Sequence, residues 1–132
     1  QAIVGLQLSQ VISFRDGWGQ QEPWGLWSDG KRSVISFKVD KNILAKKYLS
    51  LTLKGRYFNG KEKTKVQING VSYTEHDLTD KTFKIPTQSL KNNRIDIHLL
   101  HNTVFSPEEL GISKDSRKIK FGLTQLTINS VD

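Results

Sequence analysis

Residues 66–73 read VQINGVSY, two short runs of alternating apolar and polar side chains on either side of Asn69-Gly70. Alternation with a period of two is typical of a strand that buries one face. Asn and Gly both tolerate positive φ, so Asn-Gly between two such runs favours a two-residue turn. The segment therefore predicts an antiparallel β-hairpin.

The same period recurs along most of the chain. Further strands are predicted at 4–14, 35–39, 49–53, 83–85, 95–99 and 119–128. The apolar parity slips between Leu123 and Leu126, which predicts a β-bulge near Thr124-Gln125. Helix is confined to short turns, one at 42–47 and one at 106–111, where Ser106 and Glu109 have the spacing of a capping box. About eight short strands with turns between them favour an all-β fold, a two-sheet antiparallel β-sandwich of the jelly-roll type.

Length and composition indicate one globular domain over residues 1–132. The chain has a mass of 15.0 kDa, with 36% hydrophobic and 25% charged residues. The absence of cysteine excludes disulfides, thiolate zinc sites and a cysteine nucleophile. No apolar run approaches the roughly 20 residues of a membrane span. Because there is no methionine, even at position 1, we expect the chain to be part of a larger protein.

The net charge of +7 favours anionic partners such as acidic glycans, phosphate groups or nucleic acid. The predicted pairing places a set of basic side chains on one solvent face: Lys38, Lys54, Arg56, Lys65, Lys84, Arg94, Lys118 and Lys120. Such a face is consistent with simple solubility or with nucleic-acid binding. It is also consistent with binding of an acidic glycan, a teichoic-type polymer or a phosphoglycerol headgroup. Nucleic-acid binding also calls for aromatic rings on the same face, where only Tyr57 and Tyr73 are expected.

The segment at residues 17–30, GWGQQEPWGLWSDG, holds all three tryptophans of the chain. Aromatic planes beside polar side chains form platforms on which sugar rings stack. We predict that Trp18 and Trp24 stack on sugars, while Trp27 either joins them or plugs the core. The predicted hydroxyl ligands are Glu22, Gln20, Gln21 and Asp29, and the predicted contacts to anionic substituents are Lys31, Arg32 and Arg15.

Two motifs carry a resemblance to a known class of domain. The first lies in 17–30, and the second is SPEELGISKDSR at 106–117, followed by a strand with Gly122. Together they resemble accessory β-sandwich domains of bacterial envelope-polysaccharide enzymes, which occur at the C-terminal end of phosphoglycerol transferases and in bacterial glycosyltransferases. The matching positions are Glu22, Trp24, Gly25, Trp27 and Gly30 in the first motif and Asp115, Arg117 and Gly122 in the second.

The resemblance implies a non-catalytic module attached to a catalytic parent. A phosphoglycerol transferase as parent implies the periplasm, with the chain attached to a membrane enzyme, whereas most glycosyltransferases imply the cytoplasm. Of the two locations we favour the periplasm. Several matched residues also have a purely structural interpretation. Asp115 and Arg117 could pair with each other or tie their loop to the sheet, and Glu22 could accept bonds from loop amides.

Signals for catalysis and metal binding are weak. The chain has no nucleophile elbow, phosphate loop or dinucleotide fingerprint. His76, His98 and His101 lack zinc-ligand spacing, so no metal or cofactor is predicted, and a structural calcium ion stays an open alternative. We therefore expect a non-catalytic, carbohydrate-associated module that binds neutral or anionic glycan. The alternatives are a structural domain packing on its parent enzyme or another protein, and a nucleic-acid-binding domain.

Overall fold

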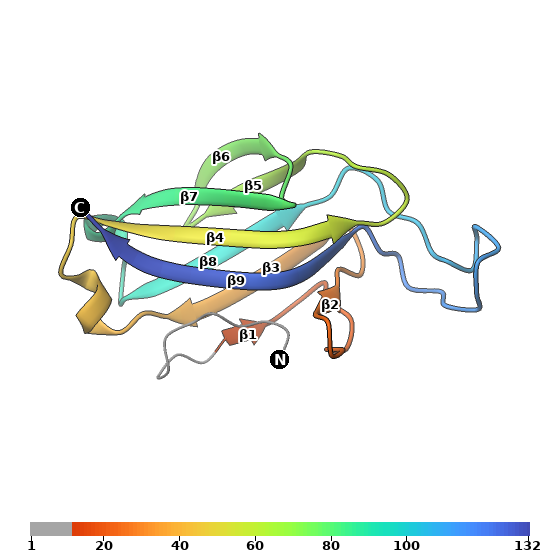
Figure 1. Ribbon diagram of the computed structural model, residues 1–132, viewed down its shortest axis with the longest axis horizontal. Helices are drawn as coiled ribbons and strands as arrows, with labels where there is room; N and C mark the ends of the chain where they lie inside the picture. The colour runs from red at the N-terminus through yellow and green to blue at the C-terminus, as the bar shows by residue number, and fades with distance from the viewer. Residues whose placement is uncertain (1–11) are drawn as a thin grey trace.

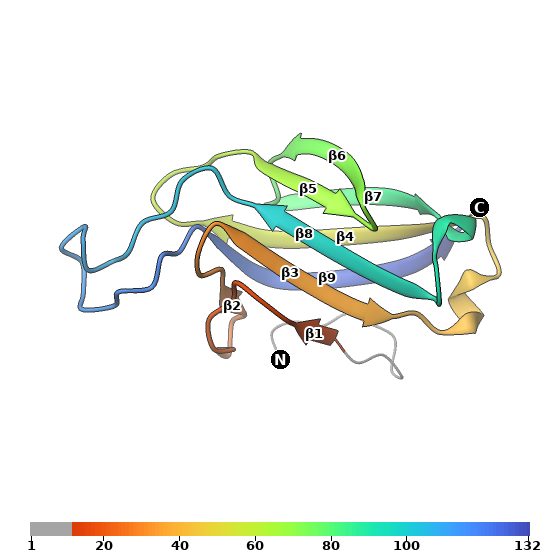
Figure 2. The same ribbon diagram turned by 180° about the vertical axis from the view of Figure 1, so that it is seen from behind.

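The computed structural model describes residues 12–132 and shows two antiparallel β-sheets packed face to face (Figures 1 and 2). The described residues form nine strands: β1 Ile12–Phe14, β2 Leu26–Trp27, β3 Arg32–Lys38, β4 Tyr48–Tyr57, β5 Thr64–Ile68, β6 Val71–His76, β7 Asp80–Pro86, β8 Arg94–Leu100 and β9 Phe121–Val131. Of the strand predicted at 4–14, the part before residue 12 lies outside the described residues. The predicted all-β sandwich is confirmed.

The chain crosses between the two sheets at almost every connection. One sheet has the order β1-β3-β8-β5-β6 and the other the order β2-β9-β4-β7. The connection that stays within a sheet is the β5–β6 hairpin, so every other consecutive pair of strands spans the sandwich. This alternation, with every pairing antiparallel, is the jelly-roll arrangement.

The core lies between the sheets and is filled by the alternating residues of each strand. Leu49, Leu51 and Leu53 of β4 have no exposed surface, and neither do Ile95 and Ile97 of β8. Each such aliphatic side chain contributes about 1.5–3 kcal/mol through burial, so these alternating runs supply much of the driving force for folding.

The hairpin and the bulge form where the sequence places them. Asn69 and Gly70 have φ values of 51° and 81°, as a type I′ turn requires, and they connect β5 to β6. In β9, Gln125 pairs with Lys54 while Leu123 pairs with Gly55, so Thr124 is the extra residue of a β-bulge. Because of this extra residue, Leu123 and Leu126 both point into the core.

Within residues 12–132, helical structure is limited to short 3-10 turns at Lys41–Leu44 and Thr87–Ser89. At 106–111 the capping-box bonds do form, from Ser106 N–H to Glu109 Oε1 at 2.6 Å and from Glu109 N–H to Ser106 Oγ at 3.0 Å. They close a turn rather than a helix, because Gly111 has a φ of 72° and redirects the chain. This turn belongs to a β8–β9 loop, residues 101–120, that projects beyond one end of the sandwich (Figure 2).

The expected single basic face does not exist. Lys54, Arg56 and Lys84 lie on the four-stranded sheet, whereas Lys38, Lys65 and Arg94 lie on the five-stranded sheet, so the two groups are on opposite sides of the sandwich. Lys118 precedes β9 in the projecting loop, and Lys120 is only 2% exposed.

The two tyrosines expected on that face are half-buried against the core. The Tyr57 hydroxyl contacts Thr64 Oγ1 at 2.8 Å and accepts a bond from Leu78 N–H, and burial raises the Tyr57 pKa.

Within residues 12–132, none of the helices is long or apolar enough to cross a bilayer.

Candidate functional site

The tryptophan-rich segment folds as an irregular hairpin at the β9 edge of the four-stranded sheet. Trp18 pairs with Ser28, and Glu22 and Gly25 exchange backbone hydrogen bonds of 2.7 and 3.1 Å at the tip. A Cβ atom at Gly25 would lie 2.0 Å from the Leu123 carbonyl oxygen, so the chain can approach β9 here only without a side chain. This approach places residues 26–27 as strand β2 beside β9.

Strand β2 turns its two side chains to opposite faces. Leu26 is 2% exposed in the core, while Trp27 lies half-buried beside Trp24, with ring centroids 5.1 Å apart and ring planes at 65°. On the other side of Trp27, Phe58 makes a second edge-to-face contact at 5.9 Å. The open question about Trp27 is therefore answered: Leu26 is the core residue, and Trp27 belongs to a surface group of rings.

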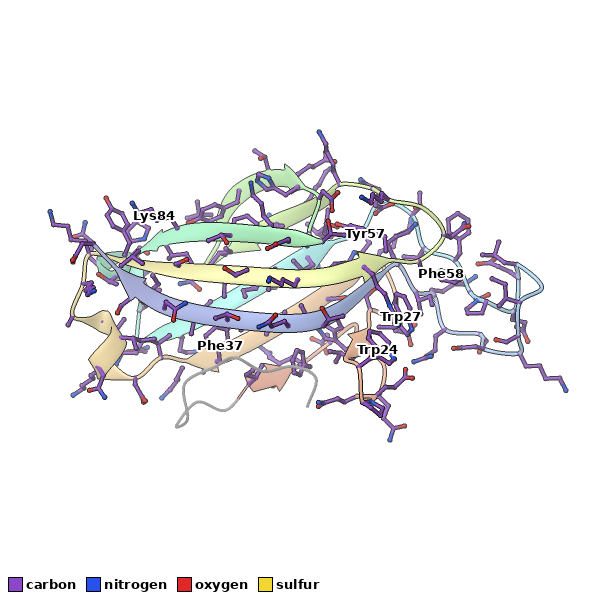
Figure 3. All side chains as sticks on the ribbon, in the orientation of Figure 1. Trp24, Trp27, Phe37, Tyr57, Phe58 and Lys84 are labelled. Atoms are coloured by element: carbon purple, nitrogen blue, oxygen red, sulfur yellow. The ribbon has the colours of Figure 1, made fainter. Side chains whose placement is uncertain are left out.

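Arg56, from the end of β4, completes this group. Its guanidinium carbon lies 4.2 Å from the Trp24 ring centroid and 5.2 Å from that of Trp27, within cation–π range. We refer to Trp24, Trp27, Arg56 and Phe58 as the Trp24 cluster. Figure 3 shows its three rings together at one end of the four-stranded sheet, with Lys84 at the other end.

The space for the two indoles depends on Gly122 of β9. A Cβ atom there would meet Trp27 at 2.9 Å and Trp24 at 3.0 Å. Any larger residue at this position would push the rings off the strand. The glycine of the second motif thus makes room for the tryptophans of the first.

Charged residues of both motifs border the Trp24 cluster. Glu22 Oε1 accepts a bond of 3.4 Å from the Trp24 indole N–H, and Glu22 Oε2 lies 4.0 Å from Arg117 Nη1. Arg117 is held by Asp115 through bonds of 2.6–3.1 Å from Nη2 and Nε. These bonds lower the Asp115 pKa and raise that of Arg117. The Asp115–Arg117 pair anticipated from the sequence is confirmed, whereas the Glu22 carboxylate bonds an indole rather than loop amides.

Backbone contacts join the two motifs into one unit. Asp29 Oδ1 accepts a bond of 3.0 Å from Lys118 N–H, and Gly30 N–H donates to the Lys118 carbonyl at 2.8 Å. Ser28 Oγ accepts from the N–H groups of Lys120 and Phe121. Asp29 therefore closes the loop through its carboxylate, a role that the sequence did not indicate.

Trp18 does not join the Trp24 cluster. Its indole N–H donates to the Val34 carbonyl at 3.1 Å, and its ring meets Phe14 edge-to-face at 5.7 Å, both on the five-stranded sheet. The ring also packs against the core. The structure therefore separates the predicted Trp18–Trp24 pair and gives Trp24 the partners Trp27, Arg56 and Phe58. Arg56 could have been anticipated as a surface residue, because its even-numbered position in β4 alternates with the odd-numbered core leucines.

The remaining predicted ligands lie around the hairpin. Gln20 and Gln21 are exposed near its tip, and Arg15, Lys31 and Arg32 are exposed where the chain enters β3. In the part of the chain that the structure describes, no hydrogen bond, ion pair or ring contact connects these five side chains to the Trp24 cluster. Their role in ligand binding stays a prediction.

A second polar group is buried behind Phe58. Lys120 Nζ donates to the Phe58 carbonyl at 2.9 Å and lies 3.8 Å from Glu62 Oε1.

His101 is buried close to this group. Its Nε2 contacts Ser33 Oγ at 3.1 Å, and Ser33 donates its own proton to the Gly17 carbonyl. His101 Nε2 must then carry the hydrogen, and burial lowers the His101 pKa to about 4. At neutral pH this imidazole is uncharged.

Among residues 12–132 there is no group of three His, Asp or Glu side chains that could hold a metal ion.

The fold and the Trp24 cluster define a jelly-roll sandwich with an aromatic, arginine-bearing surface. Searches against known family models, curated proteins and solved structures give no match to the chain. The resemblance to accessory domains of envelope enzymes therefore stays a prediction.

Proposed function

We propose that this chain is a non-catalytic glycan-binding module of a larger bacterial envelope enzyme, and that the Trp24 cluster is its binding surface. The observation that carries the proposal is the stack of Arg56 on Trp24, beside Trp27 and Phe58, at the open end of a sheet face. Half-exposed indoles offer an apolar plane to the C–H face of a pyranose. Glu22 offers an acceptor for sugar hydroxyls at the rim.

Arg56 favours an anionic glycan. Its guanidinium has no carboxylate within 4.0 Å among the described residues, and it is exposed. A guanidinium held over an indole can bind a carboxylate or phosphate in a bidentate manner while the neighbouring rings contact the sugar. A uronic acid or a phosphate-substituted sugar would use both groups together. A neutral sugar would use the rings alone.

Asp115, beside the cluster, is poorly suited to act as the general acid of glycoside hydrolysis. A general acid needs a raised pKa, whereas Asp115 is bound by Arg117 and its pKa is lowered. This supports a binding role for the chain, with catalysis supplied by the parent enzyme. The envelope setting, with the periplasm as location, rests on the motif resemblance.

The test is an NMR titration of the ¹⁵N-labelled chain with trigalacturonate and with maltotriose. We expect the Trp24 and Trp27 indole N–H signals to shift, and Arg56→Met to weaken trigalacturonate binding about tenfold. Lys84→Met is the matched control, because Lys84 stacks on Tyr48 at 4.2 Å in the same way at the other end of the sheet. Unmoved indole signals with both sugars would refute the proposal.

Docking onto another protein is a second candidate function, which the projecting loop favours. Leu110 and Ile112 at its turn are 38% and 66% exposed, and exposed aliphatic side chains close together are typical of interaction surfaces. The parent catalytic domain is the expected partner. Added as a separate chain, that domain should shift the amide signals of 108–114 and leave the indole signals of the Trp24 cluster in place.

A further inference from the structure

A groove of about 620 Å³ lies on the outer face of the five-stranded sheet, away from the Trp24 cluster. Its walls include Lys63, Lys65 and Gln67 on the β5 side and Ser72, Thr74 and Glu75 on the β6 side. Figure 2 shows β6 as a curved edge strand beside β5. The volume is within the range of about 300–1,000 Å³ of small-ligand sites.

The β6 wall is shaped by a bulge with a strained residue. Lys65 pairs with Glu75 and Gln67 with Ser72, so the single residue Val66 faces two residues of β6. Thr74, in this bulge, has a φ of 64°. The left-handed conformation costs a β-branched residue about 1–3 kcal/mol, and such strain is concentrated at functional sites. The bulge places Thr74 in the groove wall, with its hydroxyl donating to the Tyr73 carbonyl.

The charges in the groove are incompletely paired. Lys63 and Lys65 have no carboxylate within 4.0 Å among the described residues. Glu75 Oε2 accepts a bond of 3.4 Å from Asn102 Nδ2, which turns this carboxylate toward the β8–β9 loop. The groove therefore offers two free ammonium groups, one held carboxylate and an amide, with a net charge of +1 on its wall. The Ser72 hydroxyl accepts from Thr74 N–H and keeps its proton to donate, whereas the Thr74 hydroxyl donates to the Tyr73 carbonyl and can still accept.

We infer that this β5–β6 groove is a second binding site, specific for a saccharide that bears a carboxylate or phosphate group. Lys63 and Lys65 bind the anionic substituent, while Gln67, Ser72 and Thr74 bond the neighbouring hydroxyls. The inference goes beyond the proposed function, because the groove and the Trp24 cluster lie on opposite faces and can bind independently. A chain with both sites can hold two acidic residues of one polymer or cross-link two polymers.

The lining argues against a nucleic acid as the ligand. None of the described residues that line the groove is aromatic, so bases would have no ring to stack on. Glu75 would repel a continuous phosphate backbone, whereas a single sugar substituent can avoid it. Hydroxyl and amide groups match the alternating donors and acceptors of a pyranose.

The experiment uses the ¹⁵N-labelled 132-residue chain and three sugar probes, which are trigalacturonate, its methyl ester and glucose 6-phosphate, with oligothymidylate as the nucleic-acid comparison. We expect amide shifts at Lys65, Gln67 and 72–75 with the two acidic probes and none with the ester. A carboxylate source is indicated if trigalacturonate binds more tightly, and a phosphate source if glucose 6-phosphate does. Lys63→Gln/Lys65→Gln should weaken binding of both by about tenfold or more.

The matched control is Lys46→Gln/Lys47→Gln, which removes the same charge from exposed lysines just before β4. It should change the affinity less than about twofold, since it alters only the long-range field. Equal effects of the two double variants, equal binding of the ester, or preferential binding of oligothymidylate would each overturn the inference. The indole signals report the Trp24 cluster separately, so its failure and that of the groove are distinguishable.

Discussion

The backbone of Gly122 lies directly against the indole of Trp24: a Cβ atom at this position would be 3.0 Å from two carbons of the ring. The same atom would be 2.9 Å from Trp27. A strand glycine from one end of the chain thus sets the position of two tryptophans from the other end. This contact connects the two sequence motifs through packing.

Gly122→Ala should therefore displace the Trp24 cluster while the strand survives. Overpacking of this kind costs about 1–3 kcal/mol, and the free energy of unfolding measured in urea should fall by that amount. The Trp24 and Trp27 indole signals should shift strongly. Gln125→Ala, at an exposed site on the same strand, should do neither. Unchanged indole signals in Gly122→Ala would show that the rings are not held by this contact.

Trp18 and Trp24 should respond differently to truncation. Trp18→Ala removes a ring that packs on the core and bonds Val34, so we expect a loss of about 3–5 kcal/mol. Trp24→Ala removes a half-exposed ring, so its cost should be about 1–2 kcal/mol, with loss of glycan binding. Urea denaturation and the sugar titration measure the two effects. Comparable stability losses would contradict this assignment.

Lys120 should be needed for stability. Lys120→Met leaves the Phe58 carbonyl and the Glu62 carboxylate without their ammonium partner, which we expect to cost about 3 kcal/mol. Adding Glu62→Gln to it should restore part of this loss, because no uncompensated charge then remains. A double-mutant cycle in urea measures the coupling. Strictly additive losses would indicate that the two side chains do not interact.

His101 should make stability depend on pH between about 4 and 6.5. Burial lowers its folded-state pKa from 6.5 to about 4, so in this window the unfolded chain binds the proton and the folded chain does not. Stability is complete above pH 6.5 and falls as the pH drops, by up to about 1.4 kcal/mol per pH unit. The pKa values of Asp77, Glu109 and Asp115 are also lowered. Protonation of these carboxylates reduces stability mainly below their ordinary pKa values of 3.8–4.5, at the lower end of this window.

His101→Phe removes this titration and should flatten the profile of unfolding free energy between pH 6.5 and 4.5. Glu62 and Lys120 both influence the imidazole electrostatically, in opposite directions. Ser33→Ala is the companion variant, because it keeps the imidazole but removes its 3.1 Å contact. If the wild-type profile is already flat in this window, the imidazole is not buried in its neutral form.

Most of the strands, the hairpin and the bulge could be predicted, because each depends on a local pattern in the sequence. Apolar alternation fixes which side chain faces the core, and Asn69-Gly70 is compatible with only a few turn types. Similarly, the parity slip at Thr124 requires an extra residue on one strand. The Asp115–Arg117 pair could also be anticipated, because the two residues lie two positions apart.

Which rings meet depends on the packing of the two sheets. Trp18 and Trp24 look equivalent in sequence, yet one packs on the five-stranded sheet and the other stacks with Arg56. Lys120 looks like a solvent-facing strand residue, but the segment carrying Phe58 and Glu62 covers it. Such outcomes depend on how strands distant in the sequence cross between the sheets. A local pattern fixes the face of a side chain but not the neighbour that covers that face.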